Sequence, residues 1–441
     1  MFMTAYLNVL VCTLAQDKIW LIRLFMLIAI FIIITRLPRQ GYDSTNFLFA
    51  LICFCSFSIF NFNIISPDFY TIFCVFFVFK ISQYLINQKD IYIISIYSII
   101  LVFSFLLRFP NIILIPVSFV FMCVKKDLKS SLKIHIIPLI SSILYIYHID
   151  FFNLSMETHE SEKLLLNYLG DSKEVFLLIS LFFLISLLNS NIIRTFIYLI
   201  SLLILLYNNW GSSYNISYSF IIVSSIISIA LINIVKFKEY RIEIIYLIAL
   251  SFAFPFGSNT GLLKLFYLII FSPLIFNYLN ISYRPLMLNS FLLILPFCLL
   301  SKIFFNYEDL GIRHAYYKVN DKKLDFVFTN SSRRDFIENV QTEFSVLEQQ
   351  GYSVLVGGCK SHIFNYLNDY PMLSSKFYQQ DISLDLFKYL TDKSNLKFAY
   401  FHIDNYQELG NNSFSKLEQD LLSFGLKLNQ HEKFNYFTSG I

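Results

Sequence analysis

Charged residues are scarce in this chain, and their scarcity excludes several common classes of protein. Only 15% of its 441 residues are Asp, Glu, Lys or Arg, and 56% are hydrophobic, whereas a soluble domain carries about 25% charged residues. Runs of about twenty apolar residues indicate membrane spans. The composition therefore predicts a polytopic membrane protein. It excludes a cytoplasmic enzyme, a secreted disulfide module and a nucleic-acid-binding protein.

The chain also lacks the short motifs that mark many active sites. It contains no HExxH, CxxC, GxxxxGK[ST] or GxSxG sequence, so no motif predicts a zinc site or a phosphate-binding loop. Of its seven cysteines only Cys359 lies in the polar C-terminal part, which therefore has no internal disulfide to form. The other six lie in apolar segments, where cysteine behaves as a small hydrophobic residue.

Apolar runs, in contrast, are abundant. They fall at 3–15, 19–35, 44–66, 68–84, 90–107, 110–124, 134–149, 174–190, 193–208, 216–235, 242–257, 261–278 and 286–305. At the usual ~17–25 residues per span they predict about 12–13 membrane spans, the run 3–15 being short for one. We expect these spans to form one transmembrane domain, residues 1–305.

The formal charge of +4 divides unevenly along the chain. Residues 306–441 hold 17 acidic and 14 basic residues, a balance of −3. The first 305 residues hold 13 acidic and 20 basic residues, a balance of +7. An acidic tail and a basic membrane part are physically different, so we place a domain boundary near Asn306.

Orientation follows from the short loops in which Lys and Arg collect, because such loops face the cytoplasm. The strongest signal is Lys125-Lys126-Asp127-Leu128-Lys129 with Lys133, and the second is the segment 236–241. Further cytoplasmic turns are marked by Arg36 with Arg39, Lys89, Arg194 and Arg284. Counting spans from any of these signals places the same segments outside the cytoplasm, namely 66–68, 108–110, 150–173, 208–215, 255–261 and the whole tail 306–441.

The tail alternates helix and strand patterns. Helices are expected at 332–349, 381–393 and 413–424, and strands at 352–356, 396–403 and 433–438. This alternation predicts a small parallel sheet covered by helices. The predicted fold class is thus an α-helical polytopic membrane protein with a C-terminal extracytoplasmic α/β domain.

Asp68 is the first candidate for function, because polar residues at membrane depth are costly to bury and usually serve a purpose. It lies in the tight turn Ser66-Pro67-Asp68 between two spans, on the predicted outer side. Its carboxylate could bind a metal, position a sugar hydroxyl or act as a base. The alternative is that Asp68 only caps a helix starting at Phe69.

Three cations lie near the same predicted boundary. Arg23 lies about one turn inside a span, Arg108 ends another, and Lys264 follows the segment 255–261 by one turn. Arginine grips phosphate with two parallel hydrogen bonds, so these residues predict a site for a phosphate or diphosphate head group. The alternative for the arginines is snorkelling to the membrane interface.

The histidines and the acidic loop 157–162 do not indicate a particular catalytic or metal-binding site. Glu157, His159, Glu160 and Glu162 favour a solvated loop over a metal site. His135 and His148 flank one span and are expected to be packing or interface residues.

Several short segments occur in a familiar order. They are the stretch from Leu7 to Arg23, the turn Ser66-Pro67-Asp68 two spans later, Leu107-Arg108-Phe109-Pro110-Asn111 through Pro116, and in the tail 329–335, 352–356 and 365–371. This arrangement resembles GT-C-fold glycosyltransferases of the protein mannosyltransferase and aminoarabinose transferase type. In that family the "sPD" turn opens the fourth span, a later basic span ends in "LP", and the tail has a "T..R...i" helix, a strand and an aromatic "YL" segment before a proline.

The resemblance implies a multi-pass inner-membrane glycosyltransferase of envelope glycan assembly. Such an enzyme takes a sugar from a polyprenyl-phosphate-linked donor and passes it to a glycan, lipid or protein acceptor in contact with membrane lipid. By this resemblance the donor phosphate would dock to Arg23 and Arg108. Asp68 would orient the acceptor or a divalent metal; no other cofactor is expected.

One departure from the family pattern concerns the N-terminus. The family begins with a complete first span and a long outer loop that bears the catalytic acidic residue, and this chain starts, by that alignment, near the end of that loop. Asp17 is the only acidic residue before the second span. We expect either a truncated reading frame or a degenerate relative without transferase activity.

Two other functions fit a protein with many spans. An oligosaccharide polymerase of the O-antigen or capsule type has its large outer loop between spans rather than at the C-terminus. A transporter or a structural membrane subunit is the third hypothesis. Against a transporter stands the lack of Gly- or Pro-broken spans at matching positions of two halves.

Overall fold

The computed structural model describes residues 19–36, 44–60, 67–87, 90–148, 161–208, 216–255, 261–304, 316–321, 323–324, 328–357, 361–368, 397–403, 421–423, 426–430 and 435–439. The chain divides into two compact units: residues 21–311 belong to the first and residues 312–441 to the second. The expected boundary near Asn306 lies close to this division. Each unit is described by itself.

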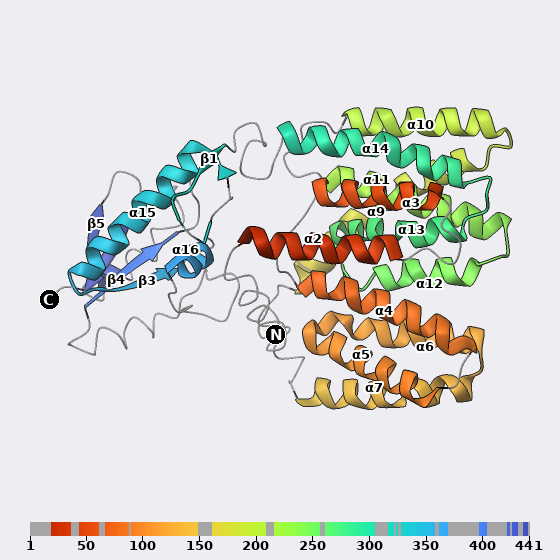
Figure 1. Cartoon of the computed structure of the whole chain (residues 1–441), viewed down its shortest axis with the longest axis horizontal. Coiled ribbons are helices and arrows are strands. Elements are labelled where there is room, and N and C mark those ends of the chain that lie inside the picture. Colours follow the sequence, from red (N-terminus) through yellow and green to blue (C-terminus); the bar gives the residue numbers. More distant parts are fainter. Residues whose placement is uncertain are drawn as a thin grey trace. The chain divides into compact units, whose positions relative to one another are not determined.

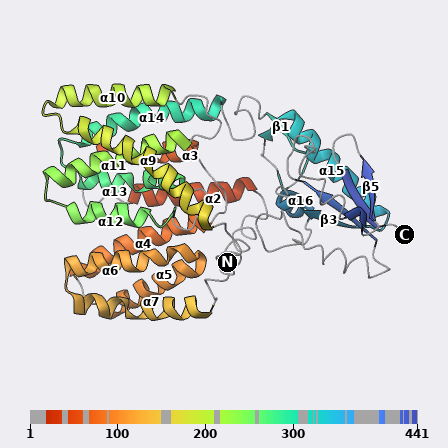
Figure 2. The ribbon, with the colours of Figure 1, turned by 180° about the vertical axis from the view of Figure 1, so that it is seen from behind.

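The first unit is a bundle of helices whose axes run roughly parallel (Figures 1 and 2). Two of its elements, η1 and η2, are 3₁₀-helices that lead directly into α-helices. The elements are α2 (Ile19–Arg36), α3 (Ser44–Phe60), α4 (Pro67–Asn87), α5 (Ile91–Leu107), η1 (Phe109–Ile113), α6 (Leu114–Lys125), α7 (Leu128–His148), α9 (Ser161–Ser186), α10 (Asn191–Asn208), α11 (Ile216–Lys236), α12 (Arg241–Ser251), η2 (Gly261–Tyr267), α13 (Leu268–Tyr278) and α14 (Arg284–Phe304).

The apolar character of these helices supports the membrane prediction. Among the described helices, four are long and apolar enough to cross a membrane: α4, α7, α10 and α11. Six further apolar stretches of 10–17 residues lie in α2, α3, α5, η1–α6, η2–α13 and α14. The apolar run at 3–15 lies outside the described residues, and the predicted total of 12–13 spans stays a prediction.

Aromatic rings join helices that are distant in sequence. Phe49 of α3 stacks on Phe276 of α13 with ring centroids 4.3 Å apart, and Phe121 of α6 stacks on Tyr246 of α12 at 3.9 Å. Stacked and edge-on aromatic pairs add to the stabilisation that their burial provides. The order in which the helices pack is therefore set by contacts across the bundle as well as by the loops.

Three helices begin at residues other than those expected. α4 begins at Pro67, a residue favoured at the first position of a helix because it has no N–H to leave unpaired, so Asp68 lies inside the helix and is not the cap of one starting at Phe69. α7 begins at Leu128, because Asp127 accepts the backbone N–H of Ser130 at 2.7 Å as a helix cap. Part of the expected outer loop 150–173 is helical as well, since α9 begins at Ser161; a helix can continue past the membrane surface.

Segments predicted to face the cytoplasm meet at one end of the bundle. Lys125 at the end of α6 pairs with Glu243 at the start of α12, with 2.5 Å between Nζ and Oε1. The ring of Tyr240 lies 5.2 Å from that of Tyr278 at the end of α13. The guanidinium of Arg194 lies 4.4 Å from the ring centroid of Tyr283. The basic segments 125–133, 194 and 236–241 thus share one end, as the charge pattern predicts.

The side of the membrane that this end faces can be tested with reporter fusions. We expect a reporter fused at Lys129 to be on the cytoplasmic side and one fused at Gly351 to be on the opposite side, because basic short loops stay inside. Reporters active only in the cytoplasm or only outside it give the readout, and a fusion at Lys238 should match the one at Lys129. The same side for Lys129 and Gly351 would contradict the predicted topology.

The second unit contains two sheets and two helices in the residues that the structure describes. A two-stranded sheet pairs β1 (Tyr317–Lys318) with β2 (Phe328–Thr329). A four-stranded sheet has the order β3-β4-β6-β5. Its strands and the helices are β3 (Ser353–Gly357), β4 (Phe398–His402), β5 (Leu426–Gln430), β6 (Asn435–Ser439), α15 (Ser331–Gln349) and α16 (Ser361–Asn368).

The predicted elements of the tail are confirmed where the structure describes them. α15 matches the helix expected at 332–349, and it ends where Gly351 has a φ of +83°, a conformation that favours glycine. β3, β4 and β6 match the three expected strands. The expected helix at 381–393 lies outside the described residues, and of the one at 413–424 the described residues 421–423 are helical.

The prediction of a parallel sheet is wrong for two of the three strand pairs of the four-stranded sheet. β3 and β4 pair in parallel, as helical connections allow, but β6 pairs antiparallel with both β4 and β5. β5 was not expected, and it is joined to β6 by the short segment 431–434. A connection this short can join only antiparallel neighbours, so the last two strands form a hairpin.

The core of the second unit lies between α15 and the sheet. Phe401 of β4 is fully buried, packs edge-on to Phe344 of α15 with centroids 4.7 Å apart, and stacks on Tyr436 of β6 at 4.7 Å. The Tyr436 hydroxyl donates a hydrogen bond of 2.7 Å to the carboxylate of Glu343. Burial, together with this carboxylate, raises the pKa of Tyr436 above its ordinary value, so the phenol stays protonated.

Candidate functional site

The site begins at the break between α5 and α6. Pro110 has no N–H with which to continue a helix, and α5 ends at Leu107 with Arg108 in an extended conformation (φ −147°, ψ 115°). The N–H of Arg108 still donates to the carbonyl of Ser104 at 3.1 Å, and Asn111 N–H donates to the carbonyl of Arg108 at 2.9 Å. The local sequence therefore aims the Arg108 side chain away from the axis of α5.

Arg108 reaches the end of another helix. Its Nη1 donates to the carbonyl of Ala253 at 2.9 Å and its Nη2 to the carbonyl of Phe254 at 2.8 Å. These carbonyls lie in the turn that follows α12, close to a helix C-terminus, where the helix dipole favours a cation. Arg108 thus caps α12, a contact between residues 145 positions apart that neither snorkelling nor phosphate binding had predicted.

A hydrogen bond between two polar side chains joins α4 to the turn that contains Arg108. Asn111 of η1 and Thr71 of α4 are both fully buried. Asn111 Nδ2 donates to Thr71 Oγ1 at 2.9 Å and to the carbonyl of Ser104 at 3.0 Å. Thr71 lies one helical turn after Asp68, so the first turn of α4 lies beside the Arg108 turn. For Asp68 the structure describes the place in the helix but not the side chain.

Lys264 belongs to an element that touches the same residues. It is a half-buried residue of η2, one turn before Tyr267. The ring of Tyr267 stacks on that of Phe254 with centroids 4.7 Å apart, and Phe254 carries one of the carbonyls that Arg108 holds. Asp68, Arg108 and Lys264 therefore come from three elements that converge at one end of the bundle.

Arg23 is not joined to this end by a described contact. It is an exposed residue in the first turns of α2, a helix that packs on α3 through Phe31 and Phe54, whose rings lie 5.3 Å apart. An exposed guanidinium on an apolar helix fits the snorkelling alternative. The predicted pairing of Arg23 with Arg108 on one phosphate therefore has no geometric support within the described residues.

Sequence reasoning missed the two residues that join the site. Thr71 follows Asp68 by three positions and Asn111 follows Arg108 by three, which places each pair one turn apart. The available signal was that both are polar side chains in apolar runs, where an unpaired polar group is costly. Reading such residues as partners for each other would have connected the 66–68 turn to the 108–110 turn.

The remaining candidates fall into two groups. His135 is fully buried, lies 3.1 Å from Ser118 Oγ and 2.9 Å from the carbonyl of Ser131, and packs edge-on to Tyr97; its predicted packing role is confirmed. The acidic loop residues 157–160 lie outside the described residues. Within the part of the chain that the structure describes, no three His, Cys, Asp or Glu side chains are grouped to hold a metal ion.

The convergent end brings together the cations Arg108 and Lys264 and, in the first turn of α4, the acidic residue Asp68. The guanidinium of Arg108 has five N–H donors and binds the carbonyls of Ala253 and Phe254. The N-terminus of α4 carries a partial positive charge, and Lys264 adds an ammonium nearby in the fold. These groups favour a negatively charged ligand at this end.

Comparisons of the chain with protein-family models, with curated proteins and with solved structures gave no match. The resemblance to GT-C-fold glycosyltransferases therefore depends on the short motifs quoted above.

Proposed function

We propose that the protein is a membrane glycosyltransferase-like protein that binds a polyprenyl-phosphate-linked sugar at the end of the bundle formed by α4, η1, α12 and η2. In this proposal the site faces the extracytoplasmic side of the inner membrane, as does the C-terminal unit. The observation that supports the proposal is that the elements of Asp68 and Arg108, which the motif resemblance expected to share a site, converge with the element of Lys264.

The proposed roles follow from the chemistry of each group. The donor phosphate binds the guanidinium of Arg108 together with the Lys264 ammonium. A carboxylate, for which Asp68 is the candidate from the sequence, accepts the proton of the acceptor hydroxyl. The acceptor oxygen then forms a bond to the anomeric carbon, and the bond from that carbon to the phosphate oxygen breaks, releasing polyprenyl phosphate.

A degenerate relative that lacks the general base would retain donor binding and a slow rate of sugar transfer. A general base typically contributes ~10²–10⁴-fold to the rate. A chain in which Asp68 does not act as the base would therefore bind the donor and transfer its sugar slowly. Donor binding and sugar transfer are thus separate measurements, and donor binding is the more direct test of the site.

Binding of a polyprenyl phosphate to the purified protein tests the role of Arg108. We expect Arg108→Ala to weaken binding by roughly ten- to a hundredfold, because a hydrogen bond to a charged partner contributes about 1.5–3 kcal/mol. Arg108→Lys should restore only part of the affinity, since an ammonium cannot cap α12 and hold phosphate with the same fork.

Asn111→Ala is the matched control, because Asn111 lies in the same turn and holds α4 but carries no charge. It should lower the unfolding temperature about as much as Arg108→Ala does while it preserves most of the affinity. Equal affinities of wild type, Arg108→Lys and Arg108→Ala would remove Arg108 from the site. An equal loss of affinity in Asn111→Ala would assign the effect to the fold of the turn.

A further inference from the structure

Helix α7 has an apolar face that none of the described helices covers. The opposite face packs on α5 and α6, where Ser98 Oγ donates to the carbonyl of Ile134 at 3.3 Å. α7 lies at one edge of the helical unit in both views (Figures 1 and 2). Its exposed large side chains are Leu128, Leu132, Ile136, Ile137, Ile140, Ile143, Leu144 and Tyr147. Together they form a continuous apolar strip along the helix.

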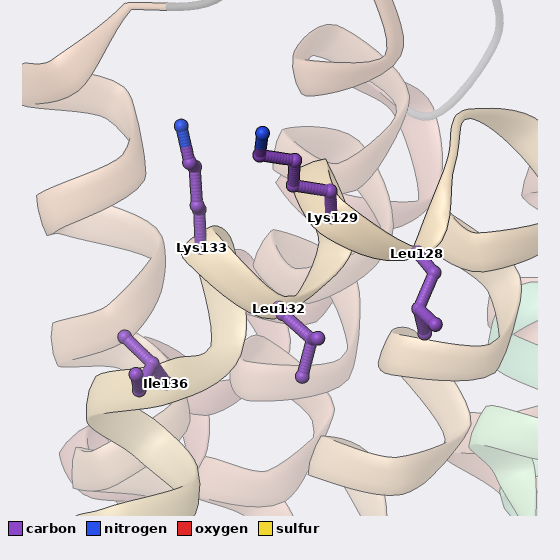
Figure 3. A pocket seen from close by; sticks show the side chains of 5 residues that line it. All are labelled: Leu128, Lys129, Leu132, Lys133 and Ile136. Atoms are coloured by element: carbon purple, nitrogen blue, oxygen red, sulfur yellow. The ribbon is translucent and has the colours of Figure 1, made fainter.

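Two lysines lie at the beginning of this strip. Lys129 and Lys133 are exposed and are one helical turn apart, and with Leu128, Leu132 and Ile136 they line a shallow hollow. Figure 3 shows both lysine side chains extending to the same side, away from Leu132. Neither ammonium has a hydrogen bond or an ion pair with a residue that the structure describes. Like charges one turn apart repel each other, so a shared anion would stabilise the pair.

The carboxylates near these lysines have other partners. Glu243 pairs with Lys125 at 2.5 Å, and Asp127 caps α7 through two bonds of 2.7 Å to Ser130. The positive charge of Lys129 and Lys133 is therefore not matched by an acidic side chain among the described contacts.

We propose that Lys129 and Lys133 bind the phosphate of one anionic phospholipid whose acyl chains lie along the exposed face of α7. Lys133 lies about 6 Å deeper than Lys129 at 1.5 Å per residue, and a lysine stem can snorkel over that distance. Basic clusters beside membrane helices are typical binding sites for anionic head groups. This site lies at the end of the bundle opposite Arg108 and does not depend on the proposed sugar transfer.

A lipid explains this surface better than a second copy of the chain does. Two copies that packed through α7 in a symmetric pair would bring four unpaired lysines together, which costs electrostatic energy. An acidic peptide would match the lysines but would leave the strip from Ile136 to Tyr147 exposed. A phospholipid satisfies both the charged end and the apolar length of the face.

Lipid titration of the full-length protein in detergent, read by native mass spectrometry, tests the proposal. The probes are phosphatidylglycerol and phosphatidylcholine with identical acyl chains. We expect wild type to bind phosphatidylglycerol more tightly. The double variant Lys129→Gln/Lys133→Gln should lose about thirtyfold in that affinity, roughly fivefold for each lysine, and should lose its preference over phosphatidylcholine.

The double variant Lys236→Gln/Lys238→Gln is the matched control, because it removes two exposed lysines from the same end of the bundle. It should keep the affinity for phosphatidylglycerol. An equal loss in both double variants, or no preference in wild type, would overturn the proposal. So would a dimer that persists without lipid and dissociates in Ile136→Gln, because that result would assign the face to a second copy. Equal unfolding temperatures of the variants would exclude misfolding as the cause.

Discussion

Replacing Arg194 by Ala is expected to lower the stability of the helical unit by about 2–4 kcal/mol. Arg194 is buried and donates to Asn191 Oδ1 at 2.8 Å and to the Tyr283 hydroxyl at 3.3 Å, while its guanidinium lies over the Tyr283 ring. Hydrogen bonds of a charged group contribute about 1.5–3 kcal/mol each, and a desolvated cation–π contact about 2. The cost of burying a charge without a carboxylate partner offsets part of this sum.

The unfolding temperature in detergent measures this effect. Lys236→Ala is the control, because Lys236 is an exposed cation at the same end and its removal should change stability by less than about 0.5 kcal/mol. Arg194→Met should be less harmful than Arg194→Ala, since a long apolar side chain fills the space and removes the buried charge. If Arg194→Ala unfolds at the same temperature as the control, the contacts of Arg194 with Tyr283 do not stabilise the packing of α10 on the turn before α14.

Replacing Phe401 by Ala is expected to destabilise the C-terminal unit by about 3–5 kcal/mol. Phe401 is fully buried and contacts Phe344 and Tyr436 from α15 and β6. Truncation of a buried Phe removes its transfer free energy and leaves a cavity. Among the described residues of this unit, the core is one cluster that includes Phe401, and a small core has little other burial to compensate for the loss.

Hydrogen exchange of the β3 and β4 amides in the full-length protein measures the loss. A destabilisation of 3–5 kcal/mol corresponds to a roughly hundredfold to several-thousandfold faster exchange through unfolding of the unit. Phe328→Ala deletes the same side chain from an exposed position of β2, where Phe328 is 50% exposed, and should change the exchange little. Similar exchange in both variants would show that the aromatic cluster does not hold the sheet to α15.

Patterns within short segments explain the predictions that the structure confirmed. The apolar runs became helices because a helix pairs every backbone N–H and C=O group within the segment, as an apolar environment requires. The basic segments gathered at one end because successive helices reverse direction. In the tail, Asn330 caps α15 by accepting the Arg333 N–H at 2.8 Å, a local interaction that sequence reasoning can anticipate. The end of α15 at Gly351 is equally local.

The errors had both local and remote causes. The start of α7 was placed too late because the cap at Asp127 was not weighed against the run of lysines. The sheet was expected to be parallel because helices and strands alternate along the tail. The pairing of β6 with β5 is instead decided by the short connection between these two strands. The prediction for Arg108 was incomplete because the carbonyls that accept its hydrogen bonds lie in the turn after α12, far away in the sequence.

The amino-acid sequence by itself determined the apolar composition, the helical segments, the basic and acidic division near Asn306 and the candidates Asp68, Arg23, Arg108 and Lys264. Each of these depends on residue type or on spacings of a few residues. Tertiary structure alone decided that the elements of Asp68, Arg108 and Lys264 converge. The physical reason is that buried polar groups must be satisfied wherever packing brings a partner: Asn111 found Thr71, 40 positions away, and Arg108 found two carbonyls beyond α12.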